Sequence, residues 1–168
     1  MFEGVVDDRD LKILRMLEED SRKPWSSIAR ELRVSETTVY LRVKRMNRLG
    51  ILSGFTVRVD PEKLGLRVTI FLLLRADASK LGQVREALSK MEILDEAYQV
   101  AGSYHFLVKV SVPRYEDALK AIESIASIEG VSKVDTIVSL RPIRRESGYV
   151  AKMLYWLKGG QARASGHE

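Results

Sequence analysis

Residues 25–51, WSSIARELRVSETTVYLRVKRMNRLGI, decide how the N-terminal part of this chain folds. Ser35, in the middle of the stretch, is a good N-cap, because its hydroxyl can accept a free N–H of a first helical turn. After it, Val39, Val43 and Met46 recur at the i, i+4, i+7 spacing of a buried helical stripe. The stretch therefore predicts two short helices joined by a sharp turn.

The opposite face of the second predicted helix combines two kinds of side chain. Short hydrogen-bonding groups lie near its start and cations lie further along, as a helix in the DNA major groove needs to reach base edges and hold phosphates. A solvated basic face on an ordinary helix is the alternative. The preceding helix, the short turn and the placement of the cations together favour DNA. The candidate DNA-binding residues are Ser35, Thr37, Thr38, Tyr40, Leu41, Arg42, Lys44, Arg45 and Arg48.

These candidates divide by chemistry. Thr37, Thr38, Tyr40 and Leu41 are predicted to contact bases, through hydroxyls or by packing on a thymine methyl, and the four cations are predicted to contact phosphates. Some alternatives stay open: Ser35 as a cap only, Thr38 as partly buried, and Arg42 in an intramolecular ion pair.

Composition limits the remaining function classes. The chain has 168 residues and a net charge of +5, and residues 22–58 alone hold nine Lys and Arg against two Asp and Glu. Such a concentration of positive charge is what a phosphate-binding surface requires. There is no Cys, which excludes disulfides, thiolate zinc sites and a cysteine nucleophile. No stretch resembles a signal peptide or a membrane span, so we expect a cytoplasmic protein with no membrane partner.

The chain divides into four parts. A helix over residues 8–20, capped by Asp7 and with Leu11, Leu14 and Leu17 inward, completes a three-helix, winged-helix-like helix-turn-helix domain at residues 1–50. Residues 51–59 alternate apolar and polar side chains, which predicts a linking strand within a hinge at residues 51–65. Residues 66–141 form the second domain, and residues 142–168 a C-terminal extension.

The second domain has the order strand, helix, strand, strand, helix, strand. This βαββαβ order predicts a ferredoxin-like α/β sandwich, so that the whole chain is α+β. The predicted strands are 67–76, 96–101, 106–112 and 131–140, and the predicted helices are 80–91 and 115–128. The side chains expected to face inward from the two helices are Leu81, Val84, Leu88, Met91, Ala118, Leu119, Ile122 and Ile125.

The first strand of this domain carries apolar residues on both faces. Phe71 and Leu73 alternate with the core-facing side chains, although the second face of a half-covered antiparallel sheet should be polar. The same sheet of another subunit is the simplest cover, which predicts a homodimer through the sheets. Cover by the chain's own tail is the alternative. A two-fold pair of recognition helices would also read a palindrome.

The C-terminal extension contains a helical stripe of Val150, Met153, Leu154 and Leu157, followed by an end predicted to be disordered. It is expected to pack on the dimer. A contact between dimers, or with DNA through nearby arginines, is the alternative.

Three strings carry a family resemblance: DxxDxxILxxLxxDSR from Asp7, IAxxLxVSxxTVxxRVxRM from Ile28, and LGIxxGFxVxVDPxKLG from Leu49. Together they resemble the Lrp/AsnC, or feast/famine, family, and the resemblance covers about residues 7–141. It implies a prokaryotic, DNA-binding transcriptional regulator that acts on palindromic promoter sites as a dimer, tetramer or octamer. Arg33 stands in the turn where the family often has Gly.

The resemblance also implies a small effector, usually an amino acid, bound near a loop between two strands. The matching residues are Ala101, Gly102, Ser103, Tyr104 and His105. The family usually has Asp at the position of His105, where a carboxylate suits an α-ammonium group. His105 therefore has three readings: a contact to a different ligand, a pH-sensitive group, or a turn residue whose hydrogen bonds are satisfied locally.

An enzyme is the competing class, because siroheme decarboxylases resemble this two-domain layout. The only histidines are His105 and His167, and the sequence shows no convergent acid, base and nucleophile. We therefore expect no catalytic residues, no metal and no cofactor.

Overall fold

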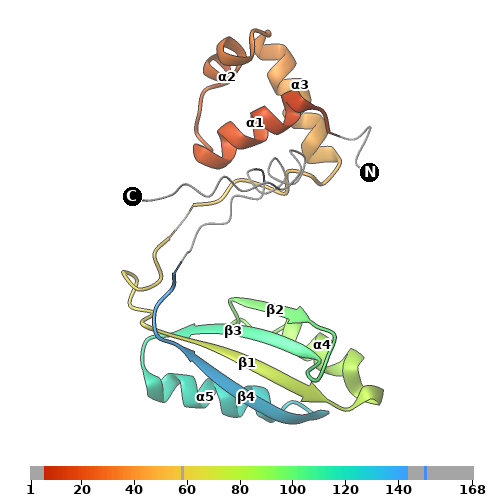
Figure 1. The fold of residues 1–168 in the computed structure, drawn as a ribbon, viewed down its shortest axis with the longest axis vertical. Coiled ribbons are helices and arrows are strands. Elements are labelled where there is room, and N and C mark those ends of the chain that lie inside the picture. The colour runs from red at the N-terminus through yellow and green to blue at the C-terminus, as the bar shows by residue number, and fades with distance from the viewer. Residues whose placement is uncertain (1–5, 58, 144–149, 151–168) are drawn as a thin grey trace, which may run out of the picture. The chain divides into compact units, whose positions relative to one another are not determined.

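The computed structural model describes residues 6–57, 59–143 and 150 (Figure 1). The described residues fall into two compact units, residues 6–57 with Val150 and residues 59–143, and each unit is described by itself. The predicted helix of the C-terminal extension lies outside the described residues, apart from Val150.

The N-terminal unit contains the three predicted helices, α1 (Asp8–Glu19), α2 (Trp25–Leu32) and α3 (Glu36–Arg48). Each contributes one apolar stripe to a shared core, as amphipathic helices do when none can bury its stripe alone. The buried members of that core are Ile13, Met16, Leu17, Ile28, Ala29, Val39, Val43 and Met46. The three-helix prediction is thereby confirmed.

The turn between α2 and α3 is tight. Arg33 adopts the left-handed conformation, with φ 54° and ψ 49°, and the N–H of Val34 donates a 3.0 Å hydrogen bond back to the carbonyl of Ala29. A non-glycine residue in this conformation costs about 1 kcal/mol. The turn thus accepts Arg33, at an energetic cost that glycine would avoid.

The strand predicted at residues 51–59 is absent from the described residues of that segment. Its first residues instead close the end of α3, since the N–H groups of Ile51 and Leu52 both donate to the carbonyl of Met46, at 2.9 and 3.2 Å. The alternating residues after them meet no second strand among the residues that the structure describes, and a strand needs a partner for its backbone hydrogen bonds. Phe55, Val57 and Val59 remain exposed. No wing hairpin follows α3 in the part of the chain described.

The second unit is a four-stranded antiparallel sheet in the order β2-β3-β1-β4. The strands are β1 (Val68–Ala76), β2 (Glu96–Gln99), β3 (Phe106–Val112) and β4 (Val131–Ser139). A short 3-10 turn, η1 (Ala78–Lys80), leads into helix α4 (Leu81–Ser89), and α5 (Tyr115–Ala126) connects β3 to β4. The predicted βαββαβ order is confirmed.

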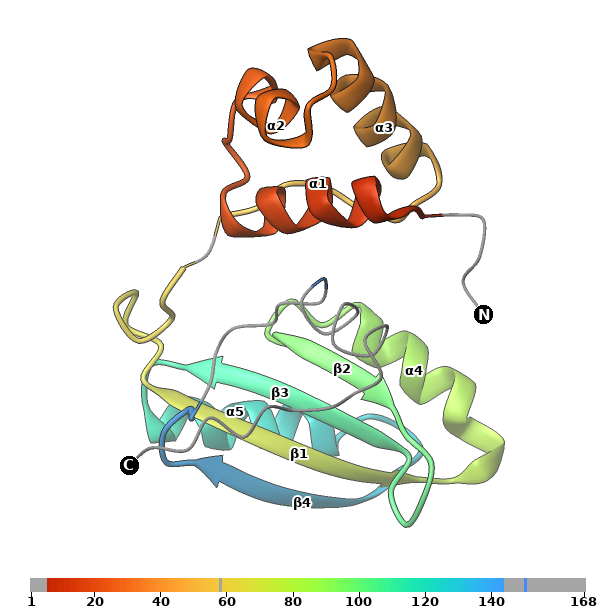
Figure 2. The ribbon, with the colours of Figure 1, turned by 45° about the horizontal axis from the view of Figure 1, so that its top comes forward.

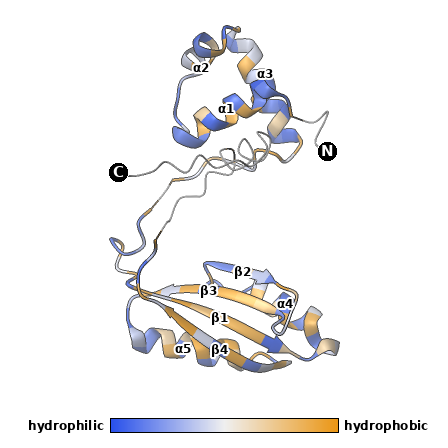
Figure 3. Ribbon diagram, viewed as in Figure 1, coloured by the Kyte–Doolittle hydropathy of each residue, from blue (hydrophilic) through white to orange (hydrophobic). Residues whose placement is uncertain are grey.

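Both helices cover one face of the sheet (Figure 2). Every second residue of β1, from Val68 to Leu74, is buried in the same core as residues of α4 and α5 such as Val84 and Ile125. The residues between them point to the other face, where Phe71 and Leu73 are half-buried. The two central strands, β1 and β3, are therefore strongly apolar in Figure 3 although only one face of the sheet carries helices.

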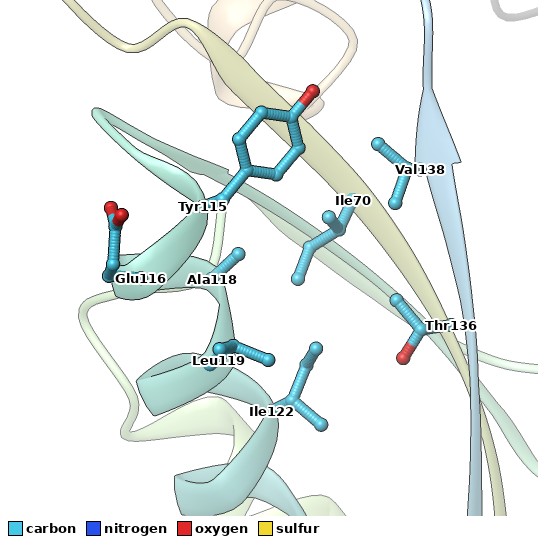
Figure 4. Close-up of a pocket in the computed structure, with 8 residues that line it drawn as sticks. All are labelled: Ile70, Tyr115, Glu116, Ala118, Leu119, Ile122, Thr136 and Val138. Atoms are coloured by element: carbon cyan, nitrogen blue, oxygen red, sulfur yellow. The ribbon is translucent and has the colours of Figure 1, made fainter.

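Helix α5 corrects one expectation about the core. Leu119, predicted to face inward, is 61% exposed, whereas Ala121, on the opposite flank of the apolar stripe, is buried. The cause is an open groove of about 370 Å³ between α5 and the edge strand β4, in which Leu119 and Ile122 face Ile70 and Val138 (Figure 4). The small side chains of Ala118 and Ala121 are buried in the core beneath α5, whereas the larger Leu119 lies at the rim of this groove.

Candidate nucleic-acid interface and effector loop

Helix α3 begins with a side-chain cap. The hydroxyl of Ser35 accepts a 3.1 Å hydrogen bond from the N–H of Thr38, and the two hydroxyl oxygens lie 2.8 Å apart. A cap of this kind stabilises a helix by about 1 kcal/mol. Val39 and Met46 are completely buried on the inner face of α3. The cap and the buried stripe together fix which face of α3 points to solvent.

Five of the predicted DNA contacts share that outer face. Tyr40 is 50% and Leu41 57% exposed, and Thr37, Lys44 and Arg48 are exposed as well. The ammonium of Lys44 lies 5.8 Å from the centre of the Tyr40 ring, a cation–π contact. The face therefore presents a hydroxyl near its leading end, apolar surface in its middle and cations along its length. Ser35 and Thr38 are engaged with each other at the cap.

The two remaining arginines of α3 have other partners. Arg42 donates from Nη1 to Asp7 at 2.6 Å and to Asp10 at 2.9 Å, and Arg45 donates to the second oxygen of Asp10. The Asp10 carboxylate is completely buried, so removing its partners would leave an uncompensated charge. These arginines hold α3 against α1, as the ion-pair alternative for Arg42 predicted. No local pattern indicated this role for Arg45.

The carboxylates of Asp7 and Asp10 also cap the N-terminus of α1. Asp7 accepts from the N–H of Asp10 at 2.9 Å and Asp10 accepts from the N–H of Asp7 at 3.0 Å, which is a reciprocal capping box. Partial burial acts to raise the pKa of Asp7, but hydrogen bonds from Arg42 and the Asp10 N–H outweigh it, and the pKa lies below its ordinary value. The cluster is thus a structural element of the N-terminal unit.

A shallow apolar groove of about 730 Å³ runs along the outer face of α3. Tyr40, Leu41 and Lys44 line it together with Trp25 and Phe55, which the sequence analysis did not select. Phe55 is 54% exposed, and its available signal was that it is the one aromatic residue of the hinge at residues 51–65. Trp25 had no such signal, because its position in the sequence suited a core residue as well as a surface residue.

In the second unit, the loop between β2 and β3 is held by its aromatic residue. The Tyr104 hydroxyl donates to Asp135 on β4, and its ring lies 5.9 Å from the Arg75 guanidinium and 5.8 Å from the Lys133 ammonium. Arg75 also donates a 3.1 Å hydrogen bond to the carbonyl of Ser103. Ala101, Gly102 and Ser103 themselves are exposed, and Gly102 has a φ of 133°. The loop tip therefore presents its backbone to solvent from a fixed base.

His105 makes three local hydrogen bonds. Its backbone N–H donates to Leu74 at 2.8 Å, its carbonyl accepts from Val100 at 2.9 Å, and its ring Nδ1 accepts from the N–H of Ala76 at 3.0 Å. The side chain thereby satisfies a backbone donor where the pairing of β1 with β3 ends. Of the three readings of His105, the structure supports the locally satisfied turn residue.

Within the described residues, no three His, Cys, Asp or Glu side chains gather in a way that could hold a metal ion. The same part of the chain contains no helix with both the length and the apolar content to cross a membrane.

Comparison with known proteins covers both units. Residues 6–47 match the AsnC-type helix-turn-helix domain, and residues 69–149 match the Lrp/AsnC ligand binding domain. The transcriptional regulator LrpA of Pyrococcus horikoshii is 33% identical over 141 residues, which are 83% of this chain and 100% of that protein. The regulator FL11 of Pyrococcus furiosus is 32% identical over 138 residues, covering 82% of this chain and 91% of its own.

Solved structures agree with the sequence relatives. AsnC of E. coli superimposes with a TM-score of 0.80 at 26% identity, covering 86% of this chain and 98% of its own. A Neisseria meningitidis regulator solved in complex with L-methionine has the same fold, with a TM-score of 0.77 at 17% identity over 84% of this chain and 94% of its own. The relatives named here are transcriptional regulators, which does not support the siroheme decarboxylase alternative. On these matches to both of its units, the chain belongs to the Lrp/AsnC family of DNA-binding transcriptional regulators.

Proposed function

We propose that this protein regulates transcription by binding palindromic promoter sites as a homodimer, with the α3 helix of each subunit in the major groove. The observation that carries this proposal is the division of cations on α3. Arg42 and Arg45 pair with acidic residues of α1, whereas Lys44 and Arg48 are exposed and have no ion-pair partner among the described residues. Cations left free on a solvent-facing helix suit phosphate binding.

Individual roles follow from position on the exposed face. Thr37 lies in the first turn of α3, where a recognition helix approaches base edges, and its hydroxyl can donate or accept a hydrogen bond. Leu41 offers apolar surface for a thymine methyl. Lys44 and Arg48, further along, would hold the backbone. Arg42 and Arg45 hold α3 in place through their ion pairs with Asp7 and Asp10 and do not contact phosphate.

The apolar second face of the sheet supports dimerisation. Phe71 and Leu73 on β1 lie in register with Ile137 on β4 and Leu107 on β3, which places these apolar groups side by side on the face without helices, next to Lys109 and Asp135. Ile137 is 53% exposed. A second copy of the same sheet would remove this surface from water, and tetramers or octamers would require further contacts.

An effector fits the loop at residues 101–105. Its exposed backbone around Gly102 can approach a ligand carboxylate, and Arg75 adds positive charge beside it, whereas the Lys133 ammonium is paired with Asp135 at 2.7 Å. The Neisseria relative of this fold was solved with L-methionine, which supports an amino acid as the ligand class. His105 lacks the negative charge that an ammonium group prefers. Titration calorimetry with the twenty amino acids tests this part, and no heat from any of them would remove amino acids as effectors.

Footprinting and fluorescence anisotropy on the protein's own promoter test the DNA part. We expect two protected half-sites about 34 Å apart. Lys44→Ala should weaken binding to all sequences and lower the slope of log K against log salt by about 1 per subunit, whereas Thr37→Ala should change sequence preference. Lys12→Ala, an exposed lysine on α1, is the matched control and should bind like the parent protein. Equal losses in all three variants would contradict the assigned face.

A further inference from the structure

Arg33 has an unusual backbone conformation. Among the described residues it is the one non-glycine residue with a positive φ, at 54°. Glycine adopts this conformation without a steric penalty, whereas a residue with a Cβ does not. Strained backbone of this kind is enriched at functional positions, so an observed case calls for a reason.

The side chain of Arg33 makes no stabilising contact with the described residues. It is exposed and makes no hydrogen bond, ion pair or ring contact with any residue that the structure describes. The nearest acidic side chains along the chain do not compensate it: Glu31 pairs with Lys23 at 3.0 Å, and Glu36 lies in the first turn of α3. Intramolecular packing therefore does not explain an arginine at this position.

The turn lies close to the leading end of α3. Arg33 is two residues before the N-cap Ser35, so their Cα atoms are at most about 7 Å apart. The major groove is about 12 Å wide and is bounded by phosphates on both sides. When the leading end of α3 enters the groove, the preceding turn comes to its edge, and a long cationic side chain there reaches the backbone.

We propose that Arg33 is a phosphate contact of the DNA complex, retained at the expense of a more stable turn. This inference rests on the proposed entry of α3 into the major groove. It adds a residue outside the recognition helix to the DNA-binding surface, and it assigns that residue to affinity rather than to sequence selection.

Replacing Arg33 by Gly should change the stability of the protein and its affinity for DNA in opposite directions. Arg33→Gly should raise the melting temperature of the N-terminal unit by a few degrees, because it removes the strain. It should also weaken binding to specific and random DNA alike, and lower the salt slope by about 1 per subunit. Arg33→Asn, which tolerates the left-handed conformation without the charge, should lose affinity in the same way. Arg33→Lys keeps the charge and should retain most of the binding.

Binding of each variant to the protein's own promoter DNA is measured with the full-length protein at several salt concentrations. Lys44→Ala is measured in parallel as a test of the recognition face itself. If Lys44→Ala weakens binding while Arg33→Gly and Arg33→Asn bind like the parent at every salt concentration, the assignment of Arg33 is overturned and the proposed recognition face stands. If Lys44→Ala has no effect either, the proposed face itself fails. An Arg33→Lys variant as weak as Arg33→Gly would also count against a phosphate contact, because either cation can bind phosphate.

Discussion

The guanidinium of Arg42 on α3 lies 2.9 Å from the carboxylate of Asp10 on α1, and that carboxylate is completely buried. Arg45 donates to the other oxygen of the same group. A buried carboxylate between two guanidinium groups contributes mainly by orientation, since its charge is expensive to leave uncompensated. This cluster therefore links α1 to α3 through side-chain ion pairs.

Asp10→Asn should therefore destabilise the N-terminal unit. Loss of one partner from a buried ion pair costs about 3–5 kcal/mol, and because Arg42 retains Asp7 we expect the lower end of that range. Urea unfolding followed by circular dichroism measures the change. Asp8→Asn, an exposed carboxylate in the same helical turn, is the control and should cost little. Similar unfolding midpoints for the two variants would show that the buried cluster does not hold the unit together.

The pKa of Asp7 predicts how this unit responds to acid. The folded value lies below the ordinary 3.8 because the hydrogen bonds from Arg42 and the Asp10 N–H outweigh the effect of burial. A lowered pKa contributes stability above the unfolded value, and that contribution is lost as the pH falls through the folded value. Unfolding free energy should thus fall more steeply for the parent than for Asp7→Asn between about pH 5 and pH 2. Because Asn is also a good N-cap, Asp7→Asn removes the charge and leaves the helix cap in place. Parallel pH profiles would contradict the role of the charge.

The sheet face offers a direct test of assembly. Leu73→Asp replaces an apolar group opposite Leu107 on β3 and places a second carboxylate beside Asp135 on β4, so it should convert a dimer to a monomer with an intact fold. Light scattering after size-exclusion chromatography gives the mass. Leu119→Asp on α5 is the matched control, since Leu119 is exposed on the helix-covered side of the sheet and should leave the dimer unchanged. A monomer from Leu119→Asp alone would instead make the α5 groove the interface.

Local patterns predicted the elements of this fold well. The stripe of Val39, Val43 and Met46 is buried as its spacing indicated, and the end of each strand was placed within two residues. A pattern cannot choose between neighbouring flanks of a helix, however. Leu119 and Ala121 border the apolar stripe of α5 on opposite sides, and in the structure Ala121 is buried whereas Leu119 lines an open groove.

Contacts between residues far apart in the sequence were harder to predict. Asp10 and Arg45 are 35 residues apart, and each had a sufficient local explanation, as a first-turn acid and as a surface cation. The linking strand failed for a related reason: alternation indicates a strand only where a partner strand exists, and the described chain provides none beside residues 51–57. The candidate DNA face was predictable because one helix carries it, whereas the roles of its arginines depended on α1.

The ring of His105 provides the last prediction. Its Nδ1 accepts the N–H of Ala76 at 3.0 Å, at the end of the β1–β3 pairing that supports the effector loop. His105→Ala leaves this partly buried donor without an acceptor and should cost about 1–3 kcal/mol. His105→Asn offers a carbonyl oxygen in a similar place and should cost less. Hydrogen exchange at the Ala76 amide, read by NMR, should accelerate strongly in the alanine variant and little in the asparagine variant. Unchanged exchange in both would mean that the hydrogen bond does not hold the loop, and His105 would then be free for a ligand.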